Sequence, residues 1–213
     1  MNPQVRNRIE AVIGISLLGF SLLLGGYFLT RWNRSQPVSQ HVISKITVEP
    51  PTPLTLELWN AYERARIAVL QQTPDAQLIS ATTQWQAAIE REMLIGADDW
   101  VFTFYTPAEK QIVIAQVNEG QAQIVQRMQV QAAPPSLTEG RWHEGPNDAL
   151  LVFMANGGRT FIEAHPEAAI NLRLGDYENR GPAWSIHASD FESQDVILVV
   201  IDAETMRVLN RAP

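Results

Sequence analysis

The chain has 213 residues, of which 46% are hydrophobic and 18% are charged, and its formal net charge is −7. This composition indicates a folded protein and excludes a disordered polar chain. An acidic surface repels phosphate groups, so nucleic-acid binding is excluded as a function class. Cysteine is absent, which excludes disulfides, thiolate nucleophiles, cysteine-bound metals and a lipid-modified cysteine.

An uncharged stretch near the N-terminus runs from Ala11 to Thr30. A helix of this length spans a hydrocarbon core of ~30 Å. The apolar part of a cleaved signal peptide is usually shorter, about 7–15 residues. Aromatic side chains at the end of the stretch suit the headgroup region better than a peptidase site. The sequence therefore predicts one transmembrane helix, with the anchor residues Ala11, Gly14, Gly19, Ser21, Gly25, Gly26, Tyr27, Phe28, Thr30 and Trp32.

The orientation of this predicted helix rests on its short basic tail. Arginines lie on both sides of the stretch, and the free amino terminus favours a cytoplasmic N-terminus. We expect a single-pass protein of the bacterial cytoplasmic membrane whose remainder lies outside. The small residues of the stretch could let another membrane helix approach closely, although glycine is common in all such helices.

The remainder of the chain divides at two segments rich in turn and linker residues. The first segment is rich in proline, serine and glutamine. The second, residues 131–146, contains three prolines and two glycines. The predicted organisation is an anchor at 1–34, a linker at 35–53, a first module at 54–130, a linker at 131–146 and a second module at 147–213.

The two predicted modules resemble each other. Leu58 corresponds to Leu150 at an offset of 92, and Trp100 corresponds to Trp184 at an offset of 84. The change of offset implies about eight extra residues in the first module. Each half reads as an amphipathic helix followed by β-branched runs, with hairpin turns predicted at Asn118-Glu119-Gly120 and Asp202-Ala203-Glu204. We expect the α+β class, with each helix lying across its own antiparallel sheet.

The repeated pattern resembles the PepSY domain family. In the second half it is carried by His165-Pro166-Glu167-Ala168, Trp184-Ser185-Ile186 and the run from Val199 to Leu209, and in the first by Thr73-Pro74-Asp75-Ala76 and Val117-Asn118-Glu119-Gly120. Met206 departs from the family's usual glycine. The resemblance implies an extracytoplasmic binding or inhibitory module and no enzyme activity.

Catalytic and metal-binding motifs are missing from the sequence. The four histidines are dispersed, and the nearest acid–base pairs are His143 with Glu144 and His187 with Asp190. Such spacing favours surface or capping roles by roughly ten to one. We therefore predict no catalytic residues, no cofactor and no metal, although a third reading as an enzyme would depend on Asp98 or His187.

Two further motifs are open to more than one reading. Gly157-Gly158 lies inside a helical pattern and favours a helix kink or a close backbone contact over a phosphate loop. The acidic pairs within residues 90–99 could bind a hard cation, but a solvated loop is the simpler interpretation.

Tryptophans separate into core and candidate interface residues. Trp100 and Trp184 align in the repeat and are expected in the core. Exposed Trp and Arg often anchor protein interfaces. The candidate partner contacts are Trp85, Asp98, Asp99, Arg141 and Trp142, with packing over the linker as an equal alternative.

These features predict a non-catalytic accessory or scaffold subunit of a larger bacterial membrane complex, for example an energy-transducing one. Its expected partners are membrane protein subunits and the lipid bilayer, with no nucleic acid and no small-molecule substrate. The alternative is a free-standing regulator of a protease or a cell-wall enzyme, of the PepSY type.

Overall fold

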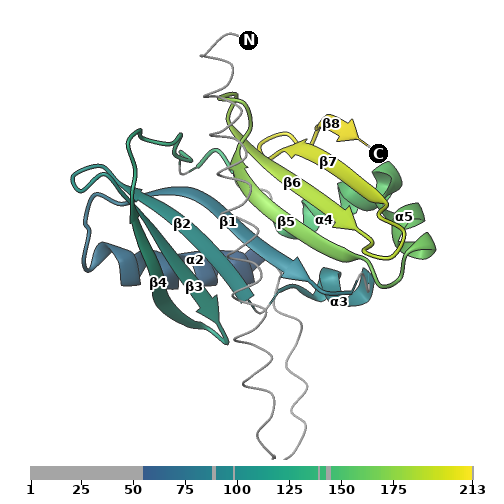
Figure 1. Ribbon diagram of the computed structural model, residues 1–213, viewed down its shortest axis with the longest axis horizontal. Coiled ribbons are helices and arrows are strands. Elements are labelled where there is room, and N and C mark those ends of the chain that lie inside the picture. The colour runs from purple at the N-terminus through teal and green to yellow at the C-terminus, as the bar shows by residue number, and fades with distance from the viewer. Residues whose placement is uncertain (1–54, 88–89, 98, 139, 143–144, 213) are drawn as a thin grey trace, which may run out of the picture. The chain divides into compact units, whose positions relative to one another are not determined.

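The computed structural model describes residues 55–87, 90–97, 99–138, 140–142 and 145–212 (Figure 1). Their strands form one antiparallel sheet of eight, in the order β4-β3-β2-β1-β5-β6-β7-β8. The strands are β1 Gln77–Trp85, β2 Asp99–Thr106, β3 Gln111–Asn118, β4 Gln121–Gln129, β5 Ala169–Asp176, β6 Pro182–Ser189, β7 Val196–Asp202 and β8 Val208–Ala212.

The helices lie on one face of this sheet (Figure 1). Helix α2 contacts strands of the first half, α4 contacts β6 and β7, and α2 and α4 contact each other. A short π-helix, η1, joins α4 to α5. The helices are α2 Thr55–Leu70, α3 Glu90–Ile95, α4 Pro146–Phe153, η1 Met154–Gly158 and α5 Arg159–Ala164.

Helix α2 shows why these residues form a sheet-covering helix. Leu58, Tyr62, Ala65 and Val69 recur at helical spacing and are all buried against the sheet. The helix ends where the Thr73 hydroxyl and amide both donate to the Val69 carbonyl oxygen, at 3.0 and 2.9 Å. The proline that follows cannot continue the helical hydrogen bonds.

The core lies between the helices and the sheet. Trp100 and Trp184 are 2% and 0% exposed, as the repeat predicted. The predicted hairpin turn after Asn118 is also confirmed, because Glu119 and Gly120 have φ values of 49° and 73°. Positive φ at both central residues is the conformation that tight two-residue hairpins require.

The two halves meet at the antiparallel pairing of β1 with β5. Ser80 pairs with Gly175, and Thr83 pairs with Leu172. The sequence offset of 92 converts position 80 into 172 and position 83 into 175, so equivalent residues pair reciprocally. The junction therefore has local two-fold symmetry.

This pairing corrects the predicted fold class. The prediction was two helix-on-sheet modules behind an N-terminal transmembrane helix, but the described strands form a single eight-stranded sheet. Burying the hydrogen-bonding edges of β1 and β5 against each other removes two exposed edges that separate modules would carry. The extra residues of the first half lie between β1 and β2, where they form α3.

The predicted anchor and its localisation also need correction. None of the helices in the described part of the chain combines the length and the apolar character needed to cross a bilayer. The predicted span at 11–30, with its anchor residues, lies outside the described residues. The single-pass anchor and the assignment to the bacterial cytoplasmic membrane are therefore not retained.

The predicted linker at 131–146 packs against the core at Leu137 and Trp142, whereas most of its other described residues are exposed. The Leu137 amide donates to the Leu78 carbonyl oxygen at 2.7 Å, and Trp142 is 1% exposed. The Trp142 ring stacks on Trp59 at 4.4 Å and meets Tyr62 edge-on at 5.5 Å. The connection between the halves thus supplies part of the core beside α2.

We expect Trp142→Ala to lower the free energy of unfolding by about 3–5 kcal/mol, because it removes a buried ring and leaves a cavity. Urea denaturation followed by circular dichroism measures the loss. Phe191→Ala is the control, since Phe191 is 78% exposed and its removal should change stability by less than about 0.5 kcal/mol. Equal midpoints for the two variants would contradict a core role for Trp142.

Candidate binding groove

The candidate partner contacts named from the sequence do not form one surface. Trp85 is half-buried and donates its indole N–H to the Gly96 carbonyl oxygen at 3.2 Å. Asp99 begins β2, and its carbonyl oxygen accepts the Thr83 hydroxyl at 2.7 Å. Asp98 lies outside the described residues. With Trp142 in the core, Asp99 and Arg141 are the exposed candidates among the described residues.

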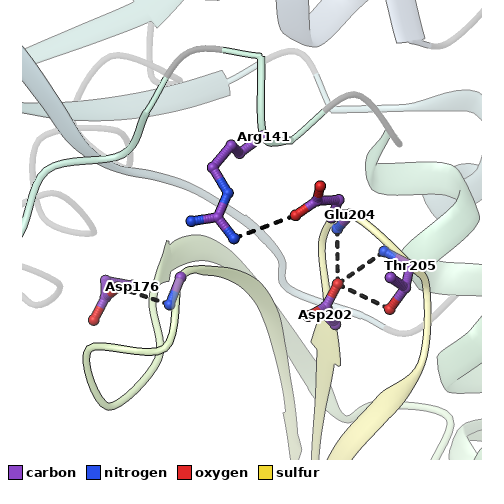
Figure 2. A network of polar contacts seen from close by, with 6 residues as sticks. Arg141, Asp176, Asp202, Glu204 and Thr205 are labelled. Atoms are coloured by element: carbon purple, nitrogen blue, oxygen red, sulfur yellow. Dashed lines mark hydrogen bonds and ion pairs between the residues drawn. The ribbon is translucent and has the colours of Figure 1, made fainter.

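Arg141 joins the connection between the halves to the turn before β8. Its guanidinium lies 3.3 Å from a carboxylate oxygen of Glu204, and both side chains are about half exposed (Figure 2). An exposed pair of this kind contributes less than about 1 kcal/mol. Arg141 is therefore exposed and weakly paired with Glu204.

The same turn is organised by Asp202. One carboxylate oxygen accepts the amides of Glu204 and Thr205, at 3.0 and 2.8 Å, and the Thr205 hydroxyl at 2.9 Å (Figure 2). Burial raises the pKa of Asp202, but these hydrogen bonds and the charge of Arg141 together hold the pKa below its ordinary value of 3.8. Asp202 is thus a structural carboxylate that fixes the β7–β8 turn.

A groove of about 720 Å³ lies at the other end of β7. One wall is a helical face from η1 and α5, and the opposite wall is the end of the sheet at β7 and β8. The helical side chains recur at spacings of three and four, which places them on one face. The groove is lined by Gly157, Thr160, Phe161, Ala164, His165, Asp195, Val196, Ile197 and Arg211.

A kink between α4 and α5 shapes the helical wall. Asn156 and Gly157 have non-helical backbone angles, and Gly157 has a φ of 101°. A Cβ on Gly158 would lie 2.4 Å from the Phe153 ring. The predicted kink is present, and the close approach at Gly158 is to the Phe153 ring at the end of α4. A π-helix inside an α-helix often marks a functional site.

Arg211 lies directly against this kink. A Cβ on Gly157 would come 2.6 Å from an Arg211 Nη atom, so the glycine leaves room for the guanidinium. Arg211 is exposed, and no described residue forms an ion pair or hydrogen bond with its side chain. The groove therefore has an uncompensated positive charge at one end.

The other end of the groove carries His165 between two carboxylates. Its Nδ1 lies 3.2 Å from Asp190, and its Nε2 lies 3.4 Å from Asp195. Hydrogen bonds from the side chain and amide of Ser193, and from Glu192 and His165, lower the pKa of Asp190 although burial raises it. Asp190 is therefore a carboxylate at neutral pH.

This arrangement does not favour acid–base catalysis. Both ring nitrogens of His165 face a carboxylate, so neither is directed at a nucleophile or a substrate. Among the described residues, no group of three or more His, Cys, Asp or Glu side chains could hold a metal ion. The groove offers apolar and charged side chains as binding contacts.

Sequence reasoning missed His165 and Arg211. It paired Asp190 with His187, which is exposed on β6, whereas the structure brings His165 to Asp190 from 25 residues away. Arg211 and Gly157 are 54 positions apart. The paired glycines Gly157 and Gly158 were the only local signal for this site. They indicated a close contact, but not which side chain makes it.

Comparisons with known proteins add little to this geometry. No protein-family model matches the chain, so the resemblance to the PepSY family gains no support and is dropped, and no curated protein matches either. A crystal structure of a candidate lipoprotein from Clostridium difficile 630 is similar with a TM-score of 0.48 and 9% identity, over 71% of this chain and 91% of that chain. A likeness this weak carries no functional argument.

The depressed pKa of Asp202 predicts an acid-sensitive contribution to stability. The carboxylate stabilises the fold above its unfolded-state pKa of about 3.9, and the contribution is lost as the pH falls through the lower folded-state value. Asp202→Asn should therefore destabilise the protein at pH 7 and differ much less from wild type at pH 2.5. Urea midpoints at both pH values measure this.

Glu192→Gln is the control for this measurement. Glu192 lies in an exposed turn, and among the described contacts only its amide takes part in a hydrogen bond. Its substitution should leave the pH dependence of the wild type intact. A gap between Asp202→Asn and wild type that stays the same at both pH values would contradict the capping role of the Asp202 carboxylate.

Proposed function

We propose that this protein is a non-catalytic binding protein, an accessory or scaffold subunit that holds a segment of another protein in the groove between α5 and the end of β7 and β8. The observation that carries the proposal is the groove itself, about 720 Å³ in volume, bordered by a helix on one side and a strand end on the other. Its volume falls in the range of about 300–1,000 Å³ that is typical of ligand sites.

Apolar side chains at the groove suit a protein partner. Val196 is 43% exposed and Phe161 is half-buried, while Ile197 forms a buried apolar part of the lining. The turn that supplies Asp195 also carries Phe191, which is 78% exposed. Exposed aromatic and aliphatic side chains that gather at one place are typical of interaction surfaces.

The charges around the groove favour binding over chemistry. His165 is held by Asp190 and Asp195, which fixes the turn at one end of the groove. Arg211 supplies the opposite charge at the other end. Charges of opposite sign at the two ends give a partner one orientation, because each end rejects the wrong charge.

We expect Thr160→Arg to remove the partner from the protein purified from its native cells. Thr160 is exposed on the groove wall, so a long charged side chain there fills the groove without disturbing the core. The measurement is co-purification of tagged full-length protein, with bound proteins identified by mass spectrometry.

Glu163→Arg is the matched control, because Glu163 is exposed on the same helix and does not line the groove. The control should retain the same partner at the wild-type ratio. A wild-type protein that purifies alone as a monomer, or a partner that survives Thr160→Arg, would contradict the proposal.

A further inference from the structure

The turn between β6 and β7, residues 190–195, holds its two acidic ends in different ways. The Asp190 carboxylate accepts the amides of Glu192 and Ser193 at 3.4 and 3.2 Å. The Asp195 carboxylate accepts no amide from this turn, all of which the structure describes. Among the described residues, its partner is the ring of His165. The position of the Asp195 side chain therefore depends on His165.

His165 is held at the end of α5, where its ring faces this turn. Its amide donates to the Phe161 carbonyl oxygen at 2.9 Å, and its ring lies 4.7 Å from the Phe161 ring. Pro166 follows and cannot continue the helix. The His165 side chain is 19% exposed. These contacts keep the ring between the two carboxylates in both of its charge states.

The charge of the His165 ring decides how many carboxylates it can hold. Its Nδ1 lies 3.2 Å from Asp190, and its Nε2 lies 3.4 Å from Asp195. A protonated imidazole has two N–H donors, whereas a neutral one has one donor and one lone pair. The protonated ring can therefore donate to both carboxylates. In the neutral ring, a lone pair faces one of the two negative charges, and this contact is repulsive.

Asp195 is the carboxylate that the neutral ring releases. The Asp190 side chain is 13% exposed and is fixed by the turn amides, whereas the Asp195 side chain is 61% exposed. Moving a carboxylate into water requires least change where it is already exposed. The single N–H of the neutral ring therefore stays with Asp190. The contact with Asp195 is present while His165 is protonated and is lost as the pH rises.

The charged groups around His165 belong to classes that keep their charge where histidine titrates. Histidine changes charge between about pH 5 and 8, and the ordinary ranges of carboxylates and arginine lie outside pH 6 to 8. A change in the turn between pH 6 and 8 therefore reports on the ring. These groups are Asp190 and Asp195 on the turn, Arg211 across the groove, and the exposed Glu163 and Glu167 beside His165 in the sequence.

We propose that His165 is a pH-sensitive latch, whose protonated ring holds Asp195 and the start of β7 against α5 and whose neutral ring releases them. Asp195 and Val196 line the groove, so release alters the wall that they form. The latch itself follows from contacts within the chain. Its effect on a bound partner rests on the proposed function, and it makes binding in the groove dependent on pH.

Amide hydrogen exchange in the full-length protein, measured by NMR at pH 6 and pH 8, tests the latch. The reporter is the protection factor of the Asp190 amide, which bonds to the Asp195 carbonyl oxygen at 2.9 Å. A protection factor already corrects for the ordinary effect of pH on exchange. We expect about three- to fivefold more protection at pH 6, since an exposed ion pair contributes modestly.

A reporter far from the latch serves as the internal reference. The Val130 amide bonds to the Lys110 carbonyl oxygen at 2.9 Å, beside β4 at the other edge of the sheet. It can open locally without breaking the contact of His165 with Asp195. Its protection should be the same at both pH values.

Two substitutions should abolish the pH dependence at Asp190. The glutamine of His165→Gln has no charge to lose, and the asparagine of Asp195→Asn can either accept from Nε2 or donate to it. Asp195 is exposed, so its substitution keeps the fold even if His165→Gln does not. His187→Gln is the matched control, because His187 is exposed on β6, and it should keep the wild-type change.

Several outcomes would overturn the latch. They are equal protection of the Asp190 amide at both pH values, a change that persists in Asp195→Asn, and a change that His187→Gln abolishes. The groove is tested separately, since retention of a partner and its loss in Thr160→Arg decide the binding function. A working latch with equal retention of the partner at pH 6 and pH 8 would overturn the regulation and leave the binding function in place.

Discussion

The pairing of β1 with β5 is the contact on which the rest of the structure depends. It lies at the centre of the sheet, and its reciprocal register relates the two halves by a local two-fold axis. Because this pairing makes one sheet, helix α2 of the first half and helix α4 of the second half lie on the same face and contact each other. The segment that connects the two halves places Trp142 in the core, where its ring stacks on Trp59.

The two halves differ at the outer edges of the sheet, and this difference produces the groove. Strand β4 pairs with all of β3, whereas the described residues of β8 pair with Leu198 to Ile201 of β7. On the helical side, α2 is continuous, whereas its counterpart is interrupted by the π-helix at Gly157. The features that the two halves share form the sheet and its covering helices, and the candidate groove lies where the two halves differ.

The sequence allowed several local features to be predicted because they depend on neighbouring residues. The buried Trp100 and Trp184, the hairpin turn at Gly120 and the kink at Gly157 all follow from side-chain period or backbone preference. The candidate site did not follow, since His165 meets Asp190 and Arg211 meets Gly157 only after distant segments pack together. No local pattern encodes contacts of that kind.

The sequence by itself determined the helical and extended segments, the turns and the internal repeat, because these depend on short-range sterics and on hydrophobic period. Whether two repeats fold separately or share a sheet was decided by tertiary structure, since an exposed strand edge can pair with any compatible edge. The same holds for Trp142, for which the sequence left an interface role and packing over the linker equally open. Its surroundings, assembled from α2 and the sheet, made it a core residue.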